Sequence, residues 1–252
     1  MEKNNIKEID KRMIDTEEGL KEYYERCANI SDYSEISGGV LNREQRRTEM
    51  FVHLLRSKKG EKLLDVGCGD GLQLEAFSKY NPHLKLFGID VSEKRIQRAQ
   101  KRVKASLLVG FANKLLFESG TFNKVMCSEV LEHVPKPRPI LEEIYRVMKD
   151  NGTLVISMPY NQEITYDICV YCGKTTPTSG HINSFNEKKI ALMLRDVGFE
   201  PLKITGAIGS ASLITPFRKI PYQLWKYLDW IIRKIRKDDL FLVAVAKKIK
   251  QK

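Results

Sequence analysis

The feature that most constrains this chain is a glycine-rich run directly after a short apolar segment. Residues 61–66 have the composition of a buried strand, and the chain continues as Gly67-Cys68-Gly69-Asp70-Gly71. Glycines at the end of a strand let the backbone turn tightly and approach a ligand closely. In an open α/β sheet, ligands bind at the carboxyl ends of the strands, so this run predicts a nucleotide-type site at that edge. Its G-x-G-x-G spacing differs from the dinucleotide pattern G-x-G-x-x-G, and no Walker lysine follows it.

Segments of strand and helix character alternate through the rest of the chain. Strands are expected at 61–66, 84–89, 107–109, 124–127, 153–158, 199–205 and 240–246, and helices at 72–80, 92–104, 139–148 and 187–197. Alternation of this kind predicts an α/β fold with a doubly wound, mostly parallel, seven-stranded Rossmann-like sheet and helices on both faces.

Three parts of the chain lie outside this alternating pattern. Residues 1–56 are polar and helical in character, with a break at Ser37-Gly38-Gly39, and we expect a lid or substrate region of two helices there. Residues 57–252 form the main domain, which carries a cleft loop at 160–186 and a helical insert at 206–239. We expect these variable parts to build the acceptor pocket.

Cysteine usage and the N-terminal residues indicate the compartment. The chain has 5 cysteines, an odd number that does not suit a secreted disulfide framework. Residues 1–11 are polar, without the apolar core of a signal peptide, and no stretch approaches the roughly 18 apolar residues that cross a bilayer. A cytoplasmic protein is therefore expected. The formal net charge of +11 would attract nucleic acid, anionic membrane or acidic substrates, but it suits a basic enzyme without such partners equally well.

A second binding element lies at the end of the next expected strand. Gly88-Ile89-Asp90 places an acidic side chain where it can accept hydrogen bonds from both hydroxyls of a ribose. Together with the glycine run, this acid favours an adenosine-type ligand.

Four motifs in this order resemble those of the class I S-adenosylmethionine-dependent methyltransferases. They are LLDVGCGDG from Leu63, GID from Gly88, CSEVLEHV from Cys127 and MKDNGTLVISMP from Met148. The resemblance covers roughly residues 60–198 and the last strand, and it is nearest to the small-molecule branch that includes quinone and lipid methyltransferases. It implies S-adenosylmethionine as cofactor and methyl transfer to a small-molecule or lipid-like acceptor.

The resemblance also assigns residues to the cofactor. Those implied are Asp65, Gly67, Cys68, Gly69, Gly71, Asp90, Val91, Phe111, Ala112, Ser128 and Glu129. The glycines would lie beside the methionine part of the cofactor, Asp65 would position its amino group and Asp90 would hold the ribose. Ser128 and Glu129 would line the mouth of the active site. The family usually has an acid where this chain has Phe111, so here the aromatic ring would stack on adenine and the backbone of Ala112 would bond its edge.

Two histidines are the candidates for catalysis. Methyl transfer from a sulfonium mainly requires that acceptor and methyl be held in line, and it needs a base only where the acceptor loses a proton. His133 follows the fourth expected strand, would face the cleft and titrates near working pH, while bracing of its loop is the alternative role. His181 would lie near the cleft entrance, where contact with the acceptor, shaping of a lid and a structural role are all open.

A lone C-x-x-C pair, Cys169 and Cys172, lies in the cleft loop. Two thiolates make half of a zinc site, and His181 offers a third ligand, but no second pair lies nearby. A plain loop is the leading prediction and we assign no metal ligand, with a zinc site or a redox thiol pair as the alternatives.

The insert contains a helix with apolar and basic residues at 221–237. Apolar side chains recur at helical spacing, and basic ones lie mostly elsewhere around the helix. We favour a helix that packs on the domain or roofs the substrate pocket. The same pattern fits an interfacial membrane helix, so peripheral membrane contact is the alternative.

Two other functions suit parts of the sequence. A nucleic-acid (RNA) methyltransferase would suit the net charge, but enzymes that methylate base nitrogens typically carry an N/D-P-P-Y/F run where this chain has Ser128-Glu129-Val130-Leu131. Nucleic acid is therefore disfavoured as a partner. A non-catalytic cofactor-binding or membrane-associated protein is the third hypothesis, and the intact glycines and Asp90 argue against lost cofactor binding.

Overall fold

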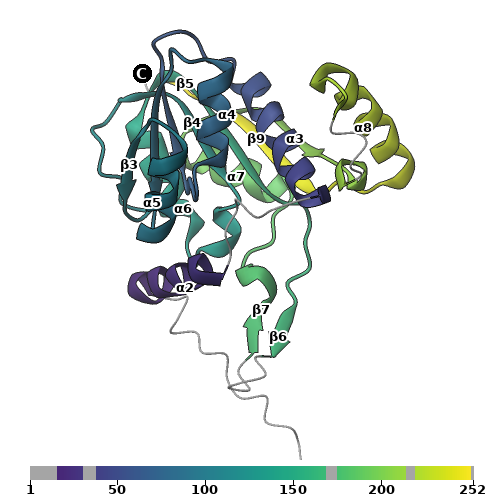
Figure 1. The fold of residues 1–252 in the computed structure, drawn as a ribbon, viewed down its shortest axis with the longest axis horizontal. Coiled ribbons are helices and arrows are strands. Elements are labelled where there is room, and N and C mark those ends of the chain that lie inside the picture. Colours follow the sequence, from purple (N-terminus) through teal and green to yellow (C-terminus); the bar gives the residue numbers. More distant parts are fainter. Residues whose placement is uncertain (1–15, 31–37, 169–174, 214–218, 251–252) are drawn as a thin grey trace, which may run out of the picture.

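A seven-stranded sheet forms the centre of the molecule (Figure 1). The computed structural model describes residues 16–30, 38–168, 175–213 and 219–250. The strands are β1 (Lys62–Val66), β2 (Lys85–Asp90), β3 (Ser106–Val109), β4 (Phe122–Ser128), β5 (Met148–Pro159), β8 (Phe199–Ala207) and β9 (Phe241–Lys248). Their order is β3-β2-β1-β4-β5-β9-β8. Strand β9 runs antiparallel to β5 and β8, and the other pairings in this sheet are parallel, which confirms the predicted mostly parallel sheet.

Helices cover both faces of the sheet, as a doubly wound fold requires. One hydrophobic cluster joins the sheet to α6 (Pro137–Val147) and α7 (Glu187–Val197). A second cluster joins the opposite face to α3 (Gly38–Leu55), α4 (Leu72–Tyr80) and α5 (Glu93–Arg102). The apolar side chains of α6 that face the sheet, Ile140, Leu141, Ile144 and Val147, have the helical spacing expected from the sequence.

Local sequence signals fix where several helices begin and end. The Ser92 hydroxyl accepts a hydrogen bond from the Arg95 amide and caps α5, and the Asn186 side chain caps α7 in the same way through the Lys189 amide. Helix α7 ends at Gly198, whose φ of 108° is one that residues with a side chain rarely adopt.

Within residues 16–30 and 38–56 the structure describes two helices, and the second begins at Gly38, inside the expected break at Ser37-Gly38-Gly39. Helix α3 packs into the core through Phe51, Val52 and Leu55. Helix α2 (Glu17–Ile30) lies instead beside α5, at the end of the molecule where the hairpin of β6 (Tyr166–Ile168) and β7 (Thr175–Pro177) also projects (Figure 1). The expected division between lid and domain at residue 56 stays a prediction.

The insert near the C-terminal end contains helix α8 (Tyr222–Arg236), which stands at the side of the molecule away from α2 (Figure 1). Pro221 directly precedes this helix at its N-cap. Among the residues that the structure describes, no helix combines the length and apolar character needed to cross a membrane.

Asn151 and Gly152, which lie between the expected helix at 139–148 and the expected strand at 153–158, belong to β5. Asn151 has a φ of 62°, so the backbone bends there although the strand continues on both sides.

Candidate active site

A cleft of about 850 Å³ opens at the carboxyl ends of β1, β2 and β4, where the glycine-rich run predicts it. Its volume is in the range of small-molecule sites. It is lined by almost all the residues singled out in the sequence: Asp65, Gly67, Cys68, Gly69, Asp90, Val91, Phe111, Ala112, Ser128, Glu129, His133 and His181. Gly71 is not among the lining residues. It lies at the N-cap of α4, where an added Cβ would come within 3.0 Å of the Ala99 Cβ, so its small size lets the loop pack on α5.

The glycine loop is held against β2 by backbone hydrogen bonds. The amides of Gly67 and Cys68 both donate to the carbonyl oxygen of Ile89, at 2.8 Å and 3.0 Å. Gly67 has a φ of 79°, and an added Cβ would lie 2.3 Å from Cγ2 of Val130. Only glycine fits this position without a shift of its surroundings.

Asp90 joins the loop to the next strand. Its Oδ2 accepts a hydrogen bond from the Gly69 amide and its Oδ1 accepts one from the Ser92 amide, both at 2.9 Å. These bonds lower the pKa of Asp90, but burial is the larger effect and the pKa is raised from its ordinary value. Each oxygen keeps a further lone pair, which suits the ribose-binding role that the resemblance implies.

Asp65 lies under the loop and is 2% exposed. Burial, with a smaller contribution from the nearby Asp90, raises its pKa to about 8. Two buried carboxyl groups and a tight glycine loop fit a ligand that carries a ribose and positive charge. S-adenosylmethionine has both, so the residues present are suited to that cofactor.

Ser128 and Glu129 lie on the wall of the cleft and belong to a polar network. Ser157 Oγ donates a 2.8 Å hydrogen bond to Glu129 Oε1 and lies 3.0 Å from Ser128 Oγ. Arg47 of α3 places Nη1 3.3 Å from the same Glu129 oxygen. Burial raises the pKa of Glu129, and Arg47 partly offsets this. Glu129 also has a φ of 55°, an unusual conformation for a residue with a side chain and one that concentrates at functional sites.

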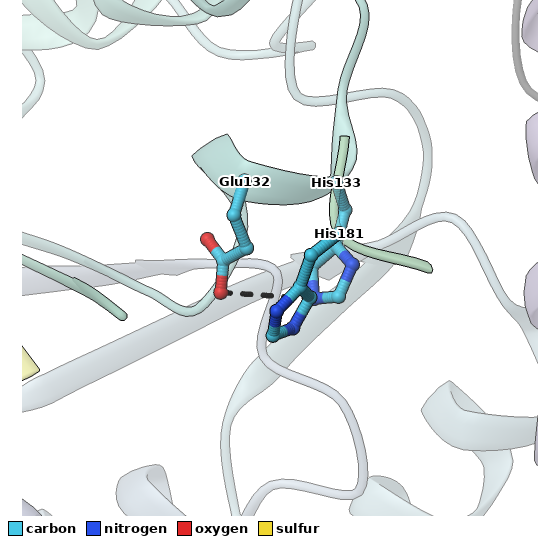
Figure 2. A group of neighbouring side chains, drawn as sticks. All are labelled: Glu132, His133 and His181. Atoms are coloured by element: carbon cyan, nitrogen blue, oxygen red, sulfur yellow. Dashed lines mark ion pairs between the residues drawn. The ribbon is translucent and has the colours of Figure 1, made fainter. Parts of the chain in front are cut away.

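His133 and His181 come together although they are far apart in the sequence. Their ring centroids are 4.7 Å apart, and Tyr24 of α2 approaches His133 edge-on at 5.8 Å. Burial is the main cause that lowers the pKa of both, to about 4 for His133, so both imidazoles are neutral at pH 7. The fully buried side chain of Glu132 lies beside them, with Oε1 3.7 Å from Nε2 of His133 (Figure 2).

The loop after β3 carries the predicted departure from the family pattern. Phe111 and Ala112 both line the cleft. The next residue, Asn113, donates a 2.9 Å hydrogen bond from Nδ2 to Oε1 of Glu17. This bond ties the loop after β3 to helix α2, which borders the same cleft.

Three residues of the site were not identified from the sequence. Glu132 lies in the EVLEHV motif, but the motif gives no sign that this side chain contacts the histidines of the site. Tyr24 and Arg47 lie in a helical region with no motif, and only the tertiary fold brings them to the cleft. Of the remaining cysteines, Cys127 is buried in the core, whereas Cys169 and Cys172 lie outside the described residues.

Comparison of the sequence with known proteins identifies the family of the chain. A family model described as a methyltransferase domain matches residues 41–204. A ubiquinone biosynthesis O-methyltransferase from Thiobacillus denitrificans is 31% identical over 159 residues, which span 58% of this chain and 68% of that protein. The 24-methylenesterol C-methyltransferase 3 of Arabidopsis thaliana is 34% identical over 43% of this chain and only 32% of its own length.

Solved structures share the fold at lower identity. A chain of the complex of the Haloferax volcanii Trm112 methyltransferase activator matches with a TM-score of 0.65 and 20% identity, over 85% of this chain and 93% of that one. The phosphoethanolamine N-methyltransferase 2 of Haemonchus contortus, solved with S-adenosylmethionine, matches with a TM-score of 0.62 and 18% identity, over 93% of this chain and 58% of that one.

Proposed function

The chain belongs to the S-adenosylmethionine-dependent methyltransferases of the methyltransferase domain family, and from this premise we propose that it methylates a hydroxyl group of a small, lipid-like acceptor. The observation that carries the proposal is that one cleft contains the glycine loop, Asp90 and two neutral histidines. Neutral imidazoles suit an acceptor that must lose a proton. The quinone O-methyltransferase relative supports a hydroxyl acceptor, and the sterol relative supports a lipid-like one.

The cofactor residues proposed are those assigned from the motifs. Gly67 and Gly69 would allow close approach of the methionine part, Asp90 would bind the ribose and Phe111 would stack on adenine. Asp65 would pair with the amino group. When bound, S-adenosylmethionine supplies a methyl group on a positively charged sulfur, which an acceptor oxygen can attack. Carboxylates around the cleft favour that charge.

His133 and His181 are proposed to receive the acceptor. Nδ1 of His133 lies 3.1 Å from the carbonyl oxygen of Gly180, so Nδ1 carries the proton and Nε2 keeps a lone pair. That lone pair can take the proton that leaves the acceptor hydroxyl. His181 would orient the acceptor beside it. Helix α2 is proposed to close the cleft as a lid, since Leu20 and Tyr24 line it.

Calorimetric titration with S-adenosylmethionine and with S-adenosylhomocysteine tests the cofactor assignment. We expect micromolar binding that is lost in Asp90→Ala and retained in Glu118→Ala, a substitution outside the cleft. A screen with radiolabelled methyl donor then compares phenolic quinone precursors, sterols and short RNA. Transfer to hydroxyl oxygen supports the proposal, while transfer only to carbon or RNA, or no cofactor binding by folded protein, would contradict it.

A lipid-like acceptor makes the surface of α8 relevant, and we propose that this helix contacts an anionic membrane surface in a cytoplasmic protein. Of the apolar residues that recur at helical spacing, the helix buries Trp225, together with Asp229, and leaves most of the others exposed. The apolar side chains at helical spacing, Leu224, Leu228, Ile231 and Ile235, are exposed, by 61% and 76% at the two ends. Tyr227 and Trp230 are also exposed, and Lys226, Lys234 and Arg236 lie on the same helix. Aromatic, aliphatic and basic side chains together suit the boundary between headgroups and acyl chains.

Vesicle flotation tests this contact. We expect wild type to float with vesicles that contain anionic lipid and Ile231→Ser/Ile235→Ser to remain in solution. Leu202→Ser, which removes an exposed leucine from β8, is the matched control and should float. Equal flotation of all three proteins, or none, would contradict a role for α8.

A further inference from the structure

Glu132, His133 and His181 form a compact cluster (Figure 2), in which the two histidines line the cleft and Glu132 lies buried behind them. One ligand atom from each lies within 4.8 Å of the other two. The Glu132 side chain is fully buried, and neither carboxylate oxygen has a hydrogen bond from another described residue. A buried carboxyl group whose oxygens accept no hydrogen bond is costly, so a cation that binds these oxygens would stabilise it.

The two histidines are oriented as metal ligands usually are. Nδ1 of His133 donates to the backbone carbonyl of Gly180, and Nδ1 of His181 lies 2.6 Å from Oε1 of Gln162. Each ring therefore holds its proton on the nitrogen that faces the protein, and each Nε2 keeps its lone pair. Metal-binding histidines typically donate their other N–H to a carbonyl in this manner, which fixes ring orientation.

The segments that carry the cluster are joined by further hydrogen bonds. The amides of Ile182 and Asn183 both donate to the backbone carbonyl of Glu132, at 2.8 Å and 3.0 Å. The Asn183 side chain donates to the carbonyl of Val134 at 2.6 Å. The segment of His181 is thus fixed to the turn that presents Glu132 and His133. These hydrogen bonds hold the three side chains close to one another.

We propose that Glu132, His133 and His181 bind a divalent metal ion, with Zn²⁺ the best match to two imidazoles and one carboxylate. Catalytic zinc sites commonly use three protein ligands and leave a fourth position for water or substrate. Zinc bonds of about 2.0–2.2 Å place neighbouring ligand atoms about 3.3 Å apart. The cluster would therefore contract on binding, a change that side-chain rotation can supply.

The open position would take the hydroxyl oxygen of the acceptor, and this part of the inference rests on the proposed function. The hydroxyl would lose its proton to water as the oxygen–metal bond forms, because a bound cation lowers the pKa of its oxygen ligand. In this arrangement the ion replaces Nε2 of His133 as the group that draws off the proton, and both histidines become positioning ligands.

Metal content of the full chain tests the site without any measurement of activity. Because a thiol pair can bind zinc by itself, the experiment uses Cys169→Ser/Cys172→Ser as background. After dialysis against Zn²⁺ and then metal-free buffer, elemental analysis should find about one zinc per chain. A chelator competition should show at least 10-fold weaker zinc binding in Glu132→Gln and His181→Asn. His83→Ala, which removes an exposed histidine outside the cleft, should bind as the background does.

Cobalt substitution gives a second readout. Co²⁺ on nitrogen and oxygen ligands should give a visible absorption that is absent from Glu132→Gln, while cofactor titration shows that each variant is folded. Folded background protein without stoichiometric metal, or Glu132→Gln with unchanged zinc affinity, would overturn the site. Loss of metal binding in Glu132→Gln with hydroxyl methylation intact would overturn the role of the ion in the reaction, although the binding site itself would stand. Metal binding without any methyl transfer would overturn the proposed function alone.

Discussion

The cleft contains carboxyl groups withdrawn from water, and Asp65 is the most fully buried of those under the glycine loop. Its pKa of about 8 means that the empty protein holds a proton on Asp65 at pH 7. A cationic ligand nearby would favour the ionised form. Binding of the charged cofactor is therefore expected to release this proton.

We expect cofactor binding at pH 7 to release about one proton, and Asp65→Asn to abolish that release and weaken binding at least 10-fold. The asparagine keeps the shape of the side chain but cannot ionise. Titrations in buffers with different ionisation enthalpies measure the released proton directly. Unchanged proton release in Asp65→Asn would show that another group titrates.

The raised pKa of Asp65 also predicts how the stability of the protein depends on pH. An unfolded aspartate has a pKa of about 3.9, so between that value and about 8 the folded protein binds a proton that the unfolded chain does not. Stability should therefore fall as the pH rises through this window. Asp65→Asn should make stability decrease less with pH, and it should raise the Tm of the cofactor-free protein at pH 8. A lower Tm of Asp65→Asn at pH 8 would contradict the raised pKa of Asp65.

A glycine can be required by the close approach of a neighbouring side chain as well as by a positive φ, or by a positive φ alone, and Gly67 and Gly60 represent these two cases. Both have positive φ, 79° and 80°, but an added Cβ meets Val130 at 2.3 Å in one case and nothing within 4 Å in the other. Gly60→Ala should cost about 1 kcal/mol from backbone strain alone. Gly67→Ala should cost a further ~1–3 kcal/mol and weaken cofactor binding. Denaturant unfolding measures both, and Gly67→Ala/Val130→Ala should recover the difference. Equal costs at the two positions would contradict the close approach.

Residues at strand ends could be assigned to the site from the sequence, but residues whose roles depend on distant neighbours could not. Gly67, Asp90 and His133 stand at strand ends, so parallel topology brought them to one edge as expected. Arg47 and Glu132 could not be assigned, because their roles depend on neighbours from distant segments. Arg47 lies on a helix before β1, and the setting of Glu132 depends on the segment that carries His181.

At the scale of elements, patterns of apolar residues located the helices and strands well but did not settle which face is buried. The strands of the main sheet and helices α4 to α8 lie within a few residues of the expected positions. For α8, the apolar stripe suggested the packed face. Most of that stripe is exposed, and the helix packs through Trp225, which belongs to the stripe, and through Asp229, which accepts hydrogen bonds from the Gly209 amide and from Arg233. Polar pairing across distant segments decided the orientation, and periodicity carries no signal of it.

Several polar contacts attach helix α2 beside the cleft. Glu25 accepts hydrogen bonds from the Ser92 hydroxyl and the Glu93 amide, and Arg98 donates to the carbonyl of Ala28 at 2.8 Å. Neither of the two hydrophobic clusters includes a residue of this helix. These contacts suit an element that opens while the domain stays folded.

We expect a variant that lacks residues 1–30 to stay folded, with a Tm lowered by only a few degrees, while the cofactor dissociates at least 10-fold faster. Glu25→Ala should give a smaller acceleration in the same direction, and Glu18→Ala, at an exposed position of the same helix, should give none. Stopped-flow dissociation of the demethylated cofactor measures the rate. Unchanged dissociation in the truncated protein would show that α2 is not a lid.

At the scale of the whole molecule, buried carboxyl groups gather at the cleft while the chain as a whole is basic. Burial raises the pKa of Asp65, Asp90, Glu129 and Glu132, which lie in or beside the cleft, and the chain carries a formal charge of +11. A cationic cofactor would favour the ionised forms of the nearby carboxyl groups. The net positive charge favours anionic surfaces, and on α8 basic and exposed apolar side chains occur together.

Attraction of basic side chains to anionic lipid and burial of the apolar side chains of α8 respond differently to salt. Electrostatic attraction between exposed charges is screened beyond about 10 Å at 0.1 M salt and beyond about 3 Å at 1 M, whereas burial of apolar side chains is not weakened by salt. We expect binding to anionic vesicles to fall as salt rises and then to level off in wild type. Ile231→Ser/Ile235→Ser should bind weakly at low salt and lose binding completely at high salt. Vesicle sedimentation across a salt series measures this. If wild type also loses all binding at high salt, net charge alone carries the association and the apolar stripe of α8 makes no contact with lipid.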